Sequence, residues 1–516
     1  MDCFPMLPIR KLLYLFRSCL SVCLAVVACG TITRADETNT FTPPAIKVPE
    51  GFVLELAAAP PLVKHPMLAC LDDRGRLFIA ETDGRNLKKE ELLQEKARFI
   101  RMLEDTDDDG KFDKSTIFAD KMVMPEGALW HNNALYVVSA PYLWRLEDTD
   151  DDGVADKREK LVGEFELNGN PNQSGPYLGP CGRIYFTGGV FGYDLVGADG
   201  KRLGKGSAAG VFSCRADGTD LEVFGQGPVN PVDVEFTPDG ELLTTAAIFD
   251  GVDGRHDALI HWIDGALTHT VYGKPLLPDT GYRLPALSRW GQVAPAGLKR
   301  YRGTAFGAAF RDNYFACQFN THQVVRTQIA PHGSTFQSVD ENFLTSEAID
   351  FHPTDVLEDA DGSLLVIDTG GWVYYGCPTS KIAKPHVLGA IYRIRKAGAA
   401  PVDDPRGRQL DWTAASDEMI ARLDDPRPAV RDRTIDMLAG RGAAAVSALD
   451  KSIRSSDIVR VRRNAIWTLS RIGTPPALEP LRAALTDSDA TVRQAAIRSV
   501  GILKDPGASD ALLTIL

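Results

Sequence analysis

One short pattern of polar and apolar positions returns six times between Pro49 and Lys396. Each copy begins with a polar turn that contains glycine or asparagine and continues into an alternating or fully apolar run of strand length. The copies lie at residues 73–80, 131–138, 181–187, 239–245, 312–317 and 361–367. They predict an all-β, six-bladed β-propeller over residues 47–396. Because the copies lie farther apart than the about 40 to 45 residues of a minimal blade, we also expect long connecting loops.

The pattern changes to helical spacing after residue 416. Three Val-Arg pairs recur at a constant interval, at residues 430–431, 461–462 and 492–493. This repeat predicts an all-α solenoid of HEAT repeats over residues 417–516, in which neighbouring helices bury each other's apolar faces. Residues 397–416, rich in Ala, Pro, Asp and Arg, are predicted to be a linker. We expect the repeated arginines to cap or bridge repeats and the solenoid to bind a protein partner.

The last helical segment, from Ala511 onward, is apolar and has no polar capping repeat after it. A solenoid that ends in this way exposes its last interface. We therefore expect either that another chain covers this end or that the sequence is the front part of a longer product.

The first 35 residues have the layout of a secretory signal. Arg10 and Lys11 precede an apolar stretch from Leu12 to Ala28, and small residues precede Asp36. Residues 26–29 also resemble a lipobox, in which Cys29 would become a lipid-anchored first residue. Both alternatives predict an exported protein, either periplasmic or at the cell surface.

Composition narrows the class of protein further. The net charge of −12 disfavours nucleic acid as a partner. Five widely scattered cysteines lie outside the leader, which is typical of buried thiols with at most one or two disulfide bonds. No Cys-x-x-Cys-His motif occurs, so the chain has no covalent haem site.

The acidic heptapeptide Glu-Asp-Thr-Asp-Asp-Asp-Gly occurs twice, at residues 104–110 and 147–153. Alternating carboxylates closed by glycine suit a loop that wraps a hard cation, and calcium is the expected ion. The expected ligands are Asp105, Asp107, Asp109 and Asp113 in the first loop and Asp148, Asp150, Asp152, Asp156 and Glu159 in the second. The first loop has Thr116 where the second has Glu159, so we expect it to bind more weakly. The alternative is a solvated acidic turn. Both loops follow segments that are predicted to be strands, which argues against a calmodulin-like sensor.

Several further motifs carry a resemblance to a known family. They are Ala294–Gly297, Phe319–His322, Phe351–Val356, Asp368–Trp372 and Cys377–Ser380. With the twin acidic loops, the leader and the HEAT repeats, they make the chain resemble the membrane-bound dehydrogenase-like propellers of PVC-type bacteria, which are similar to glucose and sorbosone dehydrogenases. The resemblance implies pyrroloquinoline quinone (PQQ) as cofactor, a histidine base, Arg and Lys on the quinone carboxylates, and calcium.

The candidate catalytic residues are two histidines and an aspartate. His352 precedes a proline, and Asp355 or Asp368 could orient its ring, while His131 ends an apolar segment. The alternative for either histidine is a structural role at a blade corner. Residues that could hold a cofactor are Arg300, Lys384, Asp233 and Trp372. A surface charge, a turn or a core tryptophan would account for the same residue types.

The sequence thus predicts an exported, calcium-binding propeller that oxidises a carbohydrate hydroxyl, with HEAT repeats that dock a partner. The alternative is a non-catalytic scaffold that binds a glycan or a protein. A lactonase-type propeller hydrolase would instead need calcium in the central channel.

Overall fold

The computed structural model describes residues 41–167, 173–188, 192–250, 254–268, 276–278, 281, 283, 285–371 and 384–515. Residues Phe41–Leu516 form one compact unit. The expected signal (1–35), Cys29, Trp372 and Cys377 lie outside the described residues.

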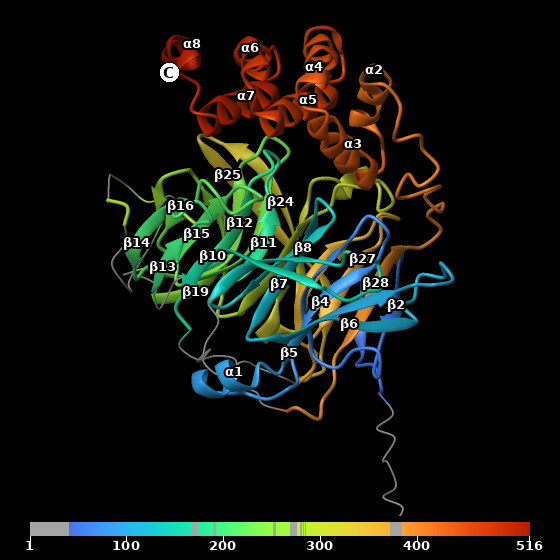
Figure 1. The fold of residues 1–516 in the computed structure, drawn as a ribbon. Coiled ribbons are helices and arrows are strands. Elements are labelled where there is room, and N and C mark those ends of the chain that lie inside the picture. Colours follow the sequence, from blue (N-terminus) through green and yellow to red (C-terminus); the bar gives the residue numbers. More distant parts are fainter. Residues whose placement is uncertain are drawn as a thin grey trace, which may run out of the picture. The chain divides into compact units, whose positions relative to one another are not determined.

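The described strands form six sheets, antiparallel except for the parallel pair β16–β20, which confirms the predicted six-bladed propeller (Figure 1). The first sheet contains β3 (Pro66–Leu71), β4 (Leu77–Glu81), β5 (Arg98–Glu104) and β6 (Lys114–Met122). The second contains β7 (Pro125–His131), β8 (Ala134–Ser139), β9 (Tyr142–Glu147), β10 (Lys157–Phe165), β13 (Tyr193–Val196) and β14 (Arg202–Gly206). The third contains β11 (Ser174–Leu178), β12 (Ile184–Gly188), β15 (Gly210–Cys214), β16 (Glu222–Gln226) and β20 (Ala266–Leu267). The fourth sheet contains β17 (Asn230–Phe236), β18 (Leu242–Asp250), β19 (Gly254–Trp262) and β21 (Ser288–Gly291). The fifth contains β22 (Pro295–Arg300), β23 (Tyr314–Gln318), β24 (Gln323–His332), β25 (Thr335–Ser346) and β1 (Ile46–Lys47). The sixth contains β26 (Pro353–Glu358), β27 (Leu364–Asp368), β28 (Ala390–Lys396) and β2 (Phe52–Ala58).

The ring of blades is closed by a strand from the start of the chain. Strand β2 pairs with β28 at the end of the propeller sequence, with Phe52 opposite Lys396. The last blade therefore combines strands from both ends of the propeller sequence. This pairing protects the sheet edge that an open ring would expose.

The innermost strand of each blade lines the propeller axis. Strands β3, β7, β11, β17, β22 and β26 each contact the next one around the ring, and β26 contacts β3 again. All six therefore present side chains to a common central space.

The helical region confirms the predicted solenoid. Its helices are α2 (Ser416–Met419), α3 (Pro428–Gly440), α4 (Ala443–Ser455), α5 (Val459–Ile472), α6 (Pro475–Ala483), α7 (Ala490–Ile502) and α8 (Ser509–Ile515). Helix α1 (Lys89–Glu95) belongs to the propeller, between β4 and β5. The repeated arginines have the expected capping role: Arg431 donates to the Asp425 carbonyl, Arg462 to that of Ser456 and Arg493 to that of Asp487.

The helices α5 and α7 pack directly on the propeller. The Trp467 indole N–H donates to the Pro238 carbonyl at 3.2 Å, and the Arg471 Nε donates to the Pro180 carbonyl at 2.9 Å. Gly240 has φ +94°, and a Cβ there would lie 2.7 Å from the Trp467 ring. The turn at Gly240 belongs to the repeated pattern in the sequence, so turns of this type accommodate the helices. One hydrophobic core continues across both regions.

Two smaller expectations can also be compared with the structure. The four cysteines among the described residues are free thiols: Cys70, Cys181, Cys214 and Cys317. Among the described residues, no helix combines the length and the apolar character that a membrane span requires.

Candidate functional site

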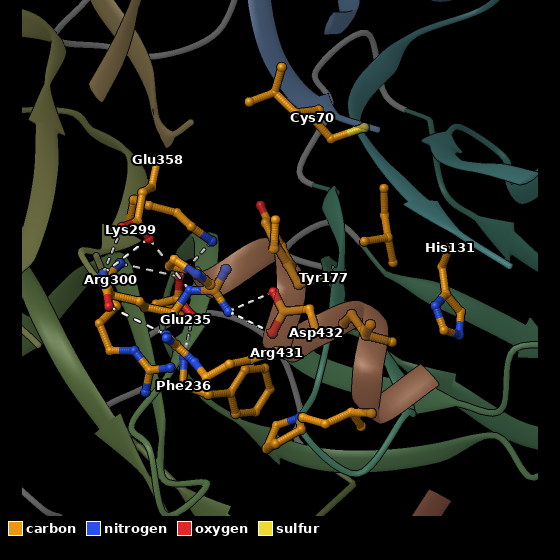
Figure 2. Close-up of a pocket in the computed structure, with 18 of the residues that line it drawn as sticks. Cys70, His131, Tyr177, Glu235, Phe236, Lys299, Arg300, Glu358, Arg431 and Asp432 are labelled. Atoms are coloured by element: carbon orange, nitrogen blue, oxygen red, sulfur yellow. Dashed lines mark hydrogen bonds and ion pairs between the residues drawn. The ribbon is translucent and has the colours of Figure 1, made fainter. Parts of the chain in front are cut away.

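A cavity of about 1240 Å³ lies on the propeller axis beneath the HEAT helices (Figure 2). Its walls come from the C-terminal halves of the six inner strands and from helices α3 and α5. Asn132, Asn133 and Ile458 on its rim are exposed, so the cavity opens to solvent. Ligand sites often lie at such a junction between two structural units.

Two buried aspartates of the cavity wall hold neighbouring blades together. The Asp233 Oδ2 on β17 accepts the Leu298 N–H of β22 at 2.7 Å, and the Asp355 Oδ2 on β26 accepts the Ala69 N–H of β3 at 2.8 Å. The Oδ1 of each aspartate accepts the N–H of the following residue. Gly297 is required beside Asp355, because a Cβ there would lie 2.5 Å from the Asp355 Oδ1.

Both carboxyl groups have pKa values above their ordinary range. Burial raises the pKa of Asp355 to about 7. Burial, and next the charge of Asp355, raise the pKa of Asp233 well above its ordinary value. A carboxyl group with a pKa near neutrality can both accept and return a proton, as general acid–base chemistry needs.

Charged residues from both regions also line the cavity. The Lys299 Nζ lies 2.8 Å from the Glu235 Oε2. Although burial acts to raise it, the charges of Lys299 and Arg300 lower the pKa of Glu235 to about 2. The Arg302 Nη1 lies 2.8 Å from the Asp432 Oδ2, which joins the propeller to α3. Figure 2 shows Glu235, Lys299 and Arg300 close to Arg431 and Asp432.

His131 also lines the cavity, on its side opposite Arg300 in Figure 2. It is the last residue of β7 and is buried. Burial lowers the pKa of His131, and the charge of Asp436 on α3 opposes this effect. The imidazole is therefore neutral at physiological pH. Tyr177 lines the cavity as well, and its hydroxyl donates to the Val232 carbonyl at 2.9 Å.

His352 and Lys384 do not line the cavity. His352 is fully buried before β26, and its ring stacks on Phe319 with centroids 4.3 Å apart. Its Nδ1 donates to the Gly370 carbonyl at 2.6 Å, and its Nε2 has no hydrogen-bond partner among the described residues. Burial lowers the pKa of His352 to about 4. The Lys384 Nζ is paired with Asp350 at 2.6 Å.

The twin acidic loops join neighbouring strands, β5 to β6 and β9 to β10. Carboxylate oxygens of Asp105, Asp107 and Asp109 lie within 4.8 Å of one another, as do those of Asp148, Asp150 and Asp156. In both loops the first aspartate accepts the N–H of the closing glycine, Gly110 or Gly153. An all-carboxylate donor set of this kind fits calcium.

The remaining predicted ligands lie outside these two groups. Asp113 accepts the Thr106 hydroxyl, and Asp152 accepts the Val154 N–H. Glu159 lies on β10, half-exposed, with its Oε2 3.8 Å from the Arg145 Nη1. The predicted strands before both loops are confirmed as β5 and β9.

Sequence comparison assigns the propeller region to a family. A model described as a domain of unknown function (DUF7133) matches residues 42–261 and 273–376, which is more than half of the chain. The chain belongs to the DUF7133 family. A HEAT-repeat model matches residues 416–501. A search of curated proteins gave no match.

Solved structures similar to this DUF7133 chain include three described as sugar dehydrogenases. The glucose dehydrogenase-type oxidoreductase of Thermus thermophilus has 16% identity, with 67% of this chain and 100% of that chain covered, at a TM-score of 0.47. The PQQ domain of pyranose dehydrogenase from Coprinopsis cinerea has 12% identity (69% and 98% covered, TM-score 0.46). The PQQ-bound aldose sugar dehydrogenase of Streptomyces coelicolor has 12% identity (68% and 100%, TM-score 0.46). At such identities and TM-scores, no residue role transfers to this chain.

The structure thus brings together four of the predicted site residues: Asp355, His131, Arg300 and Asp233. The prediction missed Glu235, Lys299 and Glu358, which line the same cavity. Glu235 could have been predicted from the sequence, since it lies two residues after Asp233 on the same strand and its side chain therefore faces the same side. The contribution of α3 and α5 left no signal in the sequence, because it depends on how the helices pack on the propeller.

Proposed function

We propose that the protein is a quinone-dependent dehydrogenase that oxidises a hydroxyl group of a carbohydrate in the axial cavity. The observation that carries this proposal is the buried pair Asp233 and Asp355, with one pKa near neutrality, in the wall of a cavity large enough for a sugar and a cofactor. Oxidation of a hydroxyl requires a group that accepts its proton, and Asp355 suits this role better than His352, which lies outside the cavity.

The cavity also contains groups that fit an anionic quinone. The Nε and Nη1 of Arg300 are buried and have no hydrogen-bond acceptor among the described residues. PQQ carries carboxylates, which Arg300 could bind through its planar fork, with Lys299 adding positive charge. When bound, PQQ would supply the two-electron acceptor. In this arrangement Asp355 holds the proton, and neutral His131 and Tyr177 contact and orient the sugar.

A specific observation favours the second candidate function, a non-catalytic binding scaffold. All four carboxylate oxygens of Asp233 and Asp355 accept backbone N–H groups, so both residues already have a structural role. In that case the same cavity would bind a polar ligand without reaction.

The two candidates differ in a direct titration. The mature chain, with calcium present, is titrated with PQQ, and the quinone absorbance is followed on addition of a panel of aldoses. A dehydrogenase gives saturable binding and sugar-dependent reduction of the quinone. Absence of binding at high micromolar PQQ would leave the scaffold as the better account.

We further propose that the acidic loops bind calcium, the second more tightly than the first. Calcium is expected to raise the melting temperature of the mature chain, because it binds only the folded loops. The Asp148→Asn variant should lose most of this increase and the matched Asp105→Asn variant a smaller part, as measured by calorimetry with calcium and with EGTA. Equal melting temperatures of the wild type under both conditions would refute the proposal.

Export and partner binding complete the proposal. The leader-like residues 1–35 would direct the protein to the periplasm or the cell surface, with or without a lipid at Cys29. Because α5 and α7 contact the chain's own propeller, a protein partner would bind the outer helices α4 and α6.

A further inference from the structure

Two arginines from different regions face the axial cavity with unused hydrogen-bond donors. Arg300 belongs to the propeller strand β22, and Arg463 belongs to helix α5. Both line the cavity. The buried Nε and Nη1 of Arg300 and the buried Nε of Arg463 have no acceptor among the described residues. A buried guanidinium donor without an acceptor costs free energy, which a ligand with suitable oxygens can recover.

Three other arginines of the cavity differ, because each already pairs with a carboxylate. Arg302 pairs with Asp432, Arg471 with Asp436 and Arg460 with Asp424. For Arg300, the Oδ1 of half-exposed Asp312 lies 3.8 Å from the guanidinium Nε, beyond hydrogen-bond reach, and Glu235 accepts the Arg300 backbone N–H at 3.2 Å. The Arg463 Nη1 donates to the Thr491 hydroxyl, a neutral group.

The two guanidinium groups also influence each other electrostatically. Burial is the main cause that lowers the pKa of Arg463, and the positive charge of Arg300 is the next. Asp239 and Asp312 oppose this effect without reversing it. Two partly buried like charges on the wall of one cavity form a place where an anion is favoured.

We propose that Arg300 and Arg463 together bind an oxyanion, a carboxylate or phosphate group of a small molecule, between the propeller and helix α5. Guanidinium groups suit this chemistry because their N–H donors match the spacing of oxygens on such groups. Lys299 forms an ion pair with Glu235, so its ammonium group does not compete with the two arginines for the oxyanion. The site shares Arg300 with the proposed quinone site and adds Arg463 from the solenoid, but its test needs neither a sugar nor a quinone.

The site has a structural consequence. One bound oxyanion would contact a strand of the propeller and a helix of the solenoid at the same time. It would therefore stabilise the junction between the two regions, and the melting temperature of the whole chain would rise with anion concentration.

The experiment uses the mature chain with inorganic phosphate and with succinate as two separate probes, and sodium chloride at matched ionic strength as the reference. Binding is measured by titration calorimetry and by the melting temperature. We expect saturable binding of at least one probe. Phosphate binding would identify a phosphoryl ligand, and succinate binding a carboxylate ligand.

Two variants and a control separate the site from a general effect of salt. Arg300→Gln and Arg463→Gln should each weaken binding about tenfold or more. Without anion, Arg463→Gln should be as stable as the wild type or more stable, because it removes a buried repulsion. The control Arg471→Gln lies on the same helix and should be less stable, since it leaves Asp436 unpaired, but should keep the anion-dependent increase.

Three outcomes would overturn the proposal. They are the absence of saturable binding of both probes, an increase equal to that with sodium chloride, and unchanged binding in the Arg300→Gln and Arg463→Gln variants. Sugar-dependent quinone reduction is measured separately, without added phosphate or succinate, so failure of this site and failure of the dehydrogenase proposal are distinguishable.

Discussion

Replacing Trp467 with alanine is expected to destabilise the protein by about 3–5 kcal/mol. The Trp467 side chain is buried in the hydrophobic core that the propeller and the solenoid share, and its indole N–H donates to the Pro238 carbonyl. Its removal leaves a cavity at the junction and an unpaired carbonyl. Because the junction loses its central contact, the HEAT helices should also unfold separately from the propeller.

Denaturant unfolding, followed by far-ultraviolet circular dichroism, measures both effects. The wild type should unfold in one transition and Trp467→Ala in two, with the helical signal lost first. Leu513→Ala is a suitable control, since Leu513 is 70% exposed on α8 and its loss should change stability by less than about 0.5 kcal/mol. A single transition of wild-type midpoint in Trp467→Ala would contradict this account of the junction.

Replacing Asp355 with alanine is expected to cost about 3 kcal/mol, because it leaves the buried N–H groups of Ala69 and Val356 without acceptors. Ala69 belongs to the first blade and Asp355 to the last, so the loss falls where the ring closes. The variant should also lose sugar oxidation. Urea unfolding measures the first effect, with exposed Asp457→Ala as the control that should remain within about 0.5 kcal/mol of the wild type.

The same aspartate predicts a pH dependence. Because the folded-state pKa of about 7 lies above the unfolded value of about 3.9, the folded state binds this proton more tightly. The stability that Asp355 contributes in this way is complete below pH 4 and is lost as the pH rises through 7. Asp355→Asn should remove this part of the pH dependence in urea unfolding measured between pH 5 and 8. An identical pH profile for variant and wild type would contradict the raised pKa.

The architecture could be predicted because both regions repeat. The Asp239–Gly240 turn and its five counterparts mark one hairpin per blade, and the Val-Arg pairs mark successive repeats, so local pattern and global fold agree. The pairing of β2 with β28 has no comparable signal, since it joins segments more than 300 residues apart.

The site could be predicted only in part, because the position of a residue relative to its strand decides whether its side chain faces the cavity. His352 and Asp355 are three residues apart, but the first precedes β26 and packs on Phe319, while the second faces the axis. The sequence offers His352 as a base from its chemistry alone. The role of Arg463 leaves no signal in the sequence, because it depends on α5 lying over the end of the propeller axis.

The central claim is that the ligand binds in the axial cavity beneath the HEAT helices. A crystal structure of the mature chain grown with calcium and PQQ tests it most directly. The account predicts quinone density in the cavity next to Arg300 and Asp355. Quinone density beside His352 and Lys384, away from the cavity, would contradict it.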